Sequence, residues 1–348
     1  MFSKAAMMLA VMLCCLAAAK AQEPYAVLSD NYTVLTFYYD NQKANRNGMD
    51  VGPFSGSDNP SWFGRSTNIT SVVIDASFAG CTTLTSTAYW FYNLQNISAI
   101  TGISNLKTDN VTSMCSMFEG CRSLTSLDLS GFKTDKVTDM NYMFYNCRSL
   151  TSLDLSRFKT GKVTDMGGMF MGCSGLTSLN VTGFNTENVT YMDFMFQGCS
   201  SLTSLDLSGF KTDNVENMGN MFYGCSCLTS LDLTGFNTGH VETMAQMFSG
   251  CSTLTTIYAG DGWSTANVQY SVSMFNGCNN LVGGAGTPFD AYHIDHTYAR
   301  IDGGSASPGY FTVKPEGTGD WAEGDLNHDG KVDAADVVWL TNLIMNQK

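Results

Sequence analysis

The chain has 348 residues, of which 14% are charged and 44% are hydrophobic, and it carries 18 Lys and Arg against 31 Asp and Glu. Binding to nucleic acid needs a basic surface that displaces counterions from phosphates, so a formal net charge of −13 argues against that function. The hydrophobic content also argues against a disordered chain, because it is enough to form a core.

Residues 1–21 have the pattern of an export signal. Lys4 precedes an apolar run from Ala5 to Leu16, and Ala19-Lys20-Ala21 supplies a cleavage site of small residues. No other apolar run reaches the roughly 18 residues that a membrane-spanning helix needs. We therefore expect a secreted, extracellular protein without a membrane span.

Residues 22–69 are expected to form an N-terminal cap with a β-hairpin. Two apolar segments, 25–28 and 34–39, flank the turn-forming sequence Ser29-Asp30-Asn31, and a loop rich in Gly, Pro and Ser follows. The aromatic residues of this region, Trp62 among them, favour covering the end of a larger core over contacting a sugar.

A repeat of fixed length occupies residues 70–296. Its cysteines at 121, 147, 173, 199, 225 and 251 are each 26 residues apart, and Cys278 follows 27 residues later. The segment that begins at Cys121 reads CRSLTSLDLSGFKTDKVTDMNYMF, and the segment that begins at Cys199 reads CSSLTSLDLSGFKTDNVENMGNMF. A unit of this size cannot bury its apolar face alone, so neighbouring units must stack as a solenoid.

Each unit is predicted to contain one strand and one helical return. In the segment 124–130, Leu127 and Leu129 alternate with polar residues, which indicates a short strand with one buried face. Val137, Met140 and Phe144 have a spacing typical of a short helix that faces the same core. The predicted fold class is therefore an α/β solenoid with parallel strands on one face, short helical returns, and a small C-terminal helix after a calcium loop.

Two further columns are expected to hold the stack together. The hydroxyl groups of a threonine column are placed to bond the backbone of the next coil, at Thr134, Thr160, Thr186, Thr212 and Thr238. The cysteine column suits a disulfide framework in a secreted protein, but neighbouring strands about 4.8 Å apart have parallel Cβ vectors, which favours buried free thiols. Cys115 and Cys227 lie off this column, so one of them is the candidate for an exposed, reactive thiol.

The outward strand face carries the candidate ligand site. One strand position holds an acidic or amide side chain in five consecutive coils, at Asp128, Asp154, Asn180, Asp206 and Asp232. Stacked like charges repel each other, so this stripe is expected to attract a cation or a basic partner. The simpler alternative is a solvated surface with no ligand.

The C-terminal region is predicted to contain a cap at 297–312, a linker at 313–323 and a calcium-binding repeat at 324–348. Side-chain oxygens occur at loop positions 1, 3, 5, 9 and 12 with Gly330 at position 6, which is the pattern of a Ca²⁺ loop. The predicted ligands are Asp325, Asn327, Asp329, the carbonyl of Lys331, Asp333 and Asp336. The apolar side of the following helix, residues 334–345, indicates either attachment to another surface or a small cap stabilised by calcium.

The 26-residue unit, with its Leu-Thr-Ser-Leu-Asp-Leu strand and Met-Phe-x-Gly-Cys corner, resembles the repeat of BspA-like leucine-rich repeat surface proteins over residues 70–312. This resemblance implies a bacterial adhesin whose leucine-rich repeat array binds host matrix proteins, or proteins and glycans of other microbes. The tail resembles a single calcium repeat of a type I dockerin, which implies a cohesin-like partner. In dockerins the residues at loop positions 10 and 11, here Ala334 and Ala335, help to select the cohesin.

The sequence contains no Gly-x-Ser-x-Gly motif, no His-Glu-x-x-His motif and no phosphate-binding loop, and we expect a protein that is not an enzyme. Two hypotheses remain. In the first, the solenoid is an adhesin that binds a protein or glycan through its strand face. In the second, the tail docks the chain, in a calcium-dependent manner, into a surface assembly that handles polysaccharide.

Overall fold

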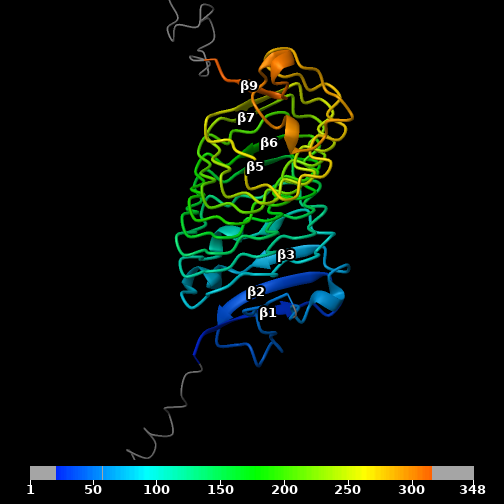
Figure 1. The fold of residues 1–348 in the computed structure, drawn as a ribbon. Coiled ribbons are helices and arrows are strands. Elements are labelled where there is room, and N and C mark those ends of the chain that lie inside the picture. Colours follow the sequence, from blue (N-terminus) through cyan, green and yellow to red (C-terminus); the bar gives the residue numbers. More distant parts are fainter. Residues whose placement is uncertain (1–20, 57, 316–348) are drawn as a thin grey trace, which may run out of the picture.

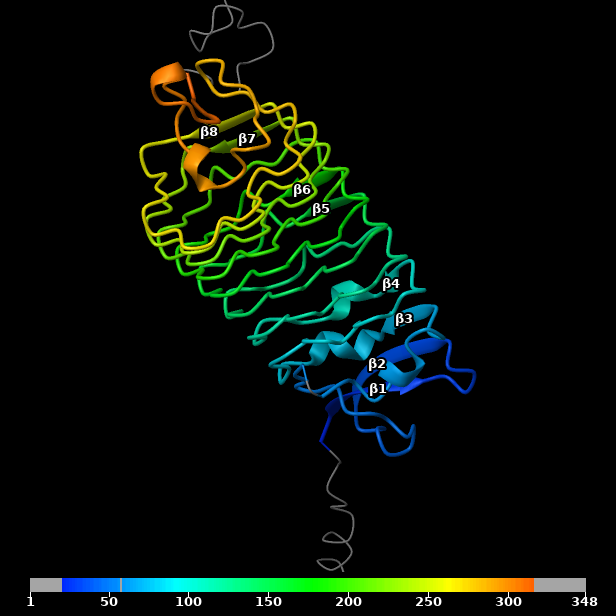
Figure 2. The ribbon, with the colours of Figure 1, turned by 45° about the vertical axis from the view of Figure 1, so that its right-hand side comes forward.

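The computed structural model describes residues 21–56 and 58–315. These residues form an elongated stack of coils, with the N-terminal hairpin at one end and the C-terminal segment at the other (Figures 1 and 2). The architecture is a repeat fold of the leucine-rich type, with short parallel strands. Most of the predicted signal segment 1–21 and the calcium repeat at 324–348 lie outside the described residues.

The N-terminal end of the stack is closed by the expected hairpin. Strand β1 (Glu23–Leu28) pairs antiparallel with β2 (Val34–Asp40), and β2 then pairs in parallel with β3 (Ser71–Ile74), which pairs with β4 (Ile100–Thr101). Trp62 is 1% exposed and its indole N–H donates to the carbonyl of Trp90. The aromatic side chain thus covers the end of the core, as its position in the sequence indicated.

The strands of the later coils are short and in register. Strand β5 (Ser152–Asp154) pairs in parallel with β6 (Ser178–Asn180), and β7 (Ser230–Leu233) pairs with β8 (Thr256–Ala259). The last strand, β9 (Phe311–Val313), pairs with β8 and extends the sheet into the segment expected to begin a linker. The strand expected at 124–130 is not formed, although Leu124 and Leu129 are buried, so side-chain burial rather than strand pairing holds that segment.

The prediction of helical returns is wrong. Among the described residues only short 3-10 helices occur: η1 (Phe63–Arg65), η2 (Ala76–Gly80), η3 (Ile103–Asn105), η4 (His296–Tyr298) and η5 (Gly304–Ala306). In the returns, alternate amides bond the next coil, as Ser116 N–H does with the Asn141 carbonyl and Phe118 N–H with the Met143 carbonyl. The amides between them bond three residues back within the coil, as Met117 N–H does with the Met114 carbonyl.

The backbone dihedral angles give the reason for this difference. Each return has a residue with positive φ between its two core positions, such as Ser116 (φ 52°) and Tyr142 (φ 54°), and a second one before the cysteine, such as Gly120 (φ 73°). An α-helix does not contain such residues, whereas a series of tight turns requires them. The apolar spacing that suggested a helix belongs to consecutive turns, which place the same side chains in the core.

The core runs the length of the stack as columns of identical side chains. The phenylalanine rings of successive coils are stacked with centroids 5.3–5.8 Å apart, from Phe91 to Phe275. The methionines on either side, such as Met140 and Met143, are fully buried. Because each coil contacts only its neighbours, most of the apolar burial is between coils.

The threonine column forms the expected ladder. Thr134 donates its hydroxyl proton to the Lys159 carbonyl at 3.1 Å and accepts from the Lys159 amide at 2.7 Å. The same pair of hydrogen bonds joins five further pairs of coils, and the distance from the threonine Oγ1 atom to the carbonyl oxygen is 2.7–2.9 Å in each. These threonines are Thr108, Thr160, Thr186, Thr212 and Thr238. Each hydroxyl therefore satisfies both backbone groups of one residue in the next coil.

The cysteine column consists of free thiols. Ten cysteines lie in the described residues and none of them forms a disulfide. The column thiols donate to the phenylalanine carbonyl of the preceding coil at 3.0–3.2 Å, as Cys147 does to Phe118. Burial raises the pKa of these thiols, to about 12 for Cys173 and Cys225, so they remain protonated donors.

Candidate functional site

The predicted acidic stripe lies on the strand face, one side chain per coil. Strand pairing places Asp154 directly opposite Asn180, and Asp232 opposite Tyr258. Asp128, Asp154 and Asp206 are exposed, whereas Asn180 and Asp232 are half-buried. We call these five side chains the strand-face column: Asp128, Asp154, Asn180, Asp206 and Asp232.

Each member of the strand-face column accepts a hydrogen bond from the backbone two residues further on. The distance from the Oδ1 atom to that amide is 3.0 Å at Asp128 and Asp154, 2.9 Å at Asp206, 3.0 Å at Asp232 and 3.2 Å at Asn180. This contact is an Asx turn, which fixes the orientation of the side chain. Its local signal in the sequence is an Asp followed two residues later by Ser or Thr, which was not recognised as a turn.

These hydrogen bonds keep the carboxylates ionised. The Ser130 and Ser156 amides, followed by the hydroxyl groups of the same serines, lower the pKa of Asp128 and of Asp154. At Asp206 the Ser208 hydroxyl and then its amide lower the pKa. The column is therefore a line of fixed side chains about 4.8 Å apart, which is negatively charged at its Asp positions and neutral at Asn180.

Two cations are close to the ends of the strand-face column. Arg157 occupies the position at which most coils have glycine, and it lines a hollow of about 90 Å³ together with Asp128 and Asp154. At the other end Lys314 donates to the Oδ2 atom of Asp232 at 2.8 Å. The carboxylate repulsion predicted from the sequence is therefore partly offset within the chain, and Asp206 lies between these two cations along the column.

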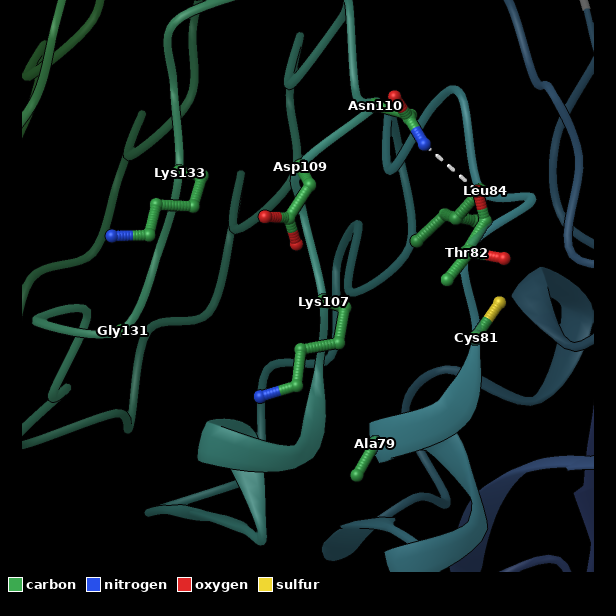
Figure 3. A pocket seen from close by; sticks show the side chains of 9 residues that line it. All are labelled: Ala79, Cys81, Thr82, Leu84, Lys107, Asp109, Asn110, Gly131 and Lys133. Atoms are coloured by element: carbon green, nitrogen blue, oxygen red, sulfur yellow. Dashed lines mark hydrogen bonds between the residues drawn. The ribbon is translucent and has the colours of Figure 1, made fainter.

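A larger hollow of about 530 Å³ lies near the N-terminal end of the stack (Figure 3). The exposed side chains of Lys107 and Lys133 come from adjacent coils, and the Asp109 carboxylate lies between them. The Asn110 side-chain amide donates to the Thr82 carbonyl at 2.9 Å and closes one side of the hollow. This hollow was not predicted from the sequence, although lysine precedes the ladder threonine in four coils.

The two cysteines outside the column differ in accessibility. Cys227 is exposed, whereas Cys115 is half-buried, and its Sγ atom lies 3.7 Å from the Tyr89 hydroxyl. Burial, followed by the nearby Asp139 carboxylate, raises the pKa of Cys115 to about 11. Cys227 is therefore the candidate for the reactive thiol.

The predicted calcium ligands lie outside the described residues, at Asp325, Asn327, Asp329, Lys331, Asp333 and Asp336. Calcium binding by this loop stays a prediction from the sequence. In residues 21–56 and 58–315, no group of three or more His, Cys, Asp or Glu side chains is arranged to hold a metal ion.

The described part of the chain has no helix of the length and apolarity that crossing a membrane requires.

Comparison with known proteins gives one family and two similar structures. Residues 85–180 and 172–285 match the family described as "Mycoplasma protein of unknown function, DUF285". A leucine-rich repeat protein of T. pallidum is 16% identical, with 74% of this chain and 86% of that chain covered and a TM-score of 0.30. A leucine-rich repeat protein from Eubacterium ventriosum is also 16% identical, with 74% and 95% covered and a TM-score of 0.24. No match was found among curated proteins.

Proposed function

This chain belongs to the DUF285 family, and we propose that it is a secreted or surface-attached bacterial adhesin whose repeat solenoid binds a partner protein through the strand-face column. The observation that carries this proposal is the uniform orientation of the column. Each carboxylate or amide is held by the same backbone contact, so the column presents side-chain oxygens at a regular interval along the stack, with negative charge at its four Asp positions.

The chemistry of the column favours a basic partner. Carboxylates whose pKa is lowered by hydrogen bonds stay charged at neutral pH, and they are fixed without the loss of side-chain freedom that binding otherwise requires. A partner segment with Lys or Arg side chains is complementary to them. Host matrix proteins and microbial surface proteins with basic segments are the proposed partners.

The test replaces Asp128, Asp154 and Asp206 together by Asn. Asn180 already occupies the same position and accepts the same amide hydrogen bond, so these substitutions remove the charge while they retain the turn. Binding of the full chain to purified matrix proteins and to bacterial cells is measured by surface plasmon resonance and cell adhesion. Loss of three exposed charge contacts is expected to weaken binding by about tenfold or more, with a smaller dependence on salt.

The matched control carries the same charge change on another face. Asp109, Asp135 and Asp213 are exposed and lie on the turns beside the threonine ladder. Their replacement by Asn is expected to leave the affinity within about twofold of the unchanged chain, because exposed charges distant from an interface contribute little. Equal binding by the two triple variants contradicts the strand-face proposal.

The alternative function is calcium-dependent docking through the tail, and the pattern of oxygen ligands from Asp325 to Asp336 favours it. Under this proposal the partner is a cohesin-like protein of a polysaccharide-handling surface assembly. A chelator then abolishes retention by the partner, and the triple Asn variant retains it. Under the adhesin proposal the chelator leaves retention by the partner unchanged, and the triple Asn variant loses it.

A further inference from the structure

A third hollow, of about 340 Å³, lies on the face formed by the returns and is distinct from the strand-face column. We call it the tyrosine slot. Tyr89 and Tyr92 from one coil line one side of it, and Tyr142 and Tyr145 from another coil line the other side. Ser116 and Glu119 come from the coil between them.

The repeat determines the geometry of the slot. Backbone hydrogen bonds join Asn93 to Glu119 and Gly120 to Tyr145, so these segments lie in three consecutive coils. The outer coils carry tyrosines at both return positions, and the middle coil carries Ser116 and Glu119 at those positions. The backbone segments that carry the two tyrosine pairs are therefore about 10 Å apart, twice the spacing of adjacent coils, and Glu119 comes from the coil between them.

The aromatic walls are ordered by contacts within the chain. The Tyr89 and Tyr92 rings are in edge-to-face contact with centroids 5.5 Å apart, and Tyr92 also stacks on Phe63 at 5.3 Å. The Tyr142 and Tyr145 centroids are 5.7 Å apart. All four tyrosines are half-buried, so part of each side chain remains open to a ligand.

The charge of the slot is negative. Glu119 is half-buried, and it forms no salt bridge within the described residues. Burial raises its pKa, and a hydrogen bond from Ser116 acts in the opposite direction. Burial, followed by the Asp193 and Asp165 carboxylates, raises the pKa of Tyr142. Neither lysine nor arginine lines the slot.

We propose that the tyrosine slot binds a lysine or arginine side chain presented by an exposed segment of a partner protein. A cation seated against Glu119 lies between the two tyrosine pairs that line the same hollow, and an aromatic face attracts a cation within roughly 6 Å of its centroid. The carboxylate supplies the opposite charge, and the tyrosine hydroxyl groups accept hydrogen bonds from ammonium or guanidinium N–H groups. An anionic ligand is disfavoured by Glu119, and a neutral sugar leaves its charge unpaired.

The experiment titrates the full chain with a capped tetralysine peptide at low ionic strength, with calorimetry and proton NMR as readouts. The chain carries the Asp128, Asp154 and Asp206 to Asn substitutions, so that the strand-face column does not compete for the peptide. Two slot variants are compared, Glu119→Gln and Tyr142→Asn. Both copy residues of the chain itself, because Gln197 and Asn220 occupy the equivalent positions of other coils and Asn220 has a similar φ of 59°.

Each slot variant is expected to weaken tetralysine binding by about fivefold or more, and Tyr142→Asn also removes the upfield shift of the lysine ε-methylene protons caused by the rings. The matched control is Tyr223→Ser, which copies Ser249 at a partly exposed tyrosine outside the slot and leaves both readouts unchanged. Far-ultraviolet circular dichroism verifies the fold of each variant. If Tyr142→Asn fails to fold, the affinity of the Glu119→Gln variant for tetralysine tests the proposal by itself.

Unchanged tetralysine binding in a folded Glu119→Gln variant overturns the proposal. Binding of maltotetraose in preference to tetralysine also overturns it, and assigns the slot to a neutral glycan instead. Neither result affects the strand-face proposal, because that proposal rests on a different surface and on different variants.

Discussion

The threonine ladder makes the most specific prediction about stability, and Thr186 in the middle of the stack is the position to change. Its side chain is 1% exposed, and its hydroxyl donates to the Lys211 carbonyl at 2.7 Å and accepts from the Lys211 amide at 2.7 Å. Valine has nearly the same shape but neither a donor nor an acceptor. Thr186→Val therefore removes two hydrogen bonds between adjacent coils while it retains the packing.

The magnitude follows from these two contacts. A hydrogen bond within a protein contributes about 1 kcal/mol net, and a buried backbone group left without its partner costs about 1–3 kcal/mol. The expected loss in the free energy of unfolding is about 2–4 kcal/mol for Thr186→Val. Thr186→Ser keeps the hydroxyl and loses one methyl group, so about 1 kcal/mol is expected for it.

The measurement is urea unfolding followed by circular dichroism, with Thr203→Val as the control. Thr203 is exposed, and its substitution is expected to change the free energy of unfolding by less than about 0.5 kcal/mol. If Thr186→Val is no less stable than Thr186→Ser, the ladder hydroxyls do not contribute to stability and the reasoning is refuted. If Thr186→Val lowers the free energy of unfolding by no more than Thr203→Val does, the same conclusion follows.

Three further predictions concern single groups. Alkylation of the folded chain at pH 8, detected by mass spectrometry, is expected to label Cys227 and to spare column thiols such as Cys147. The column thiols are buried and their pKa is raised, so they are neither accessible nor ionised. Rapid labelling of Cys147 contradicts the structure. Asp302 is 8% exposed, and its burial acts to raise its pKa, but it accepts hydrogen bonds from the Thr287 hydroxyl and amide and from the Gly304 and Ala285 amides, which together lower the pKa to about 2. Its stabilisation, about 2 kcal/mol, is full above the unfolded pKa of about 4 and is lost as pH falls toward 2, so the destabilisation by Asp302→Asn should disappear in acid unfolding curves. Replacing Asp325 and Asp329 by Ala is expected to abolish calcium binding in calorimetry, whereas calcium binding that survives both changes places the ligands elsewhere.

The sequence was most informative about burial and the order of the coils. The 26-residue period predicted the stack, and the alternation in LTSLDLS predicted which leucines face the core. The threonine hydroxyls were also predicted correctly, because a small polar side chain that recurs in a buried column must satisfy backbone groups of the next coil. These inferences depend on periodicity alone.

The conformation of the returns could not be obtained in the same way. The spacing of Val137, Met140 and Phe144 suits one face of a helix and also suits consecutive turns. Only the hydrogen bonds between coils, together with the positive φ of residues such as Tyr142, distinguish the two arrangements. A local pattern does not contain this information, because the partner of each amide lies in the next repeat.

The candidate sites also differ in whether the sequence predicted them. The strand-face column was found from sequence because its members share one position of the repeat, and periodicity brings such positions into register. The tyrosine slot was not found, because its two repeat positions carry different side chains from coil to coil and therefore show no column in the sequence. The ion pair of Asp232 with Lys314 was not found, because it joins residues 82 apart. The sequence by itself thus determined the repeating core and the side chains that line up along it, whereas only the tertiary structure decided which different positions of neighbouring coils meet, because that depends on the path of the backbone between them.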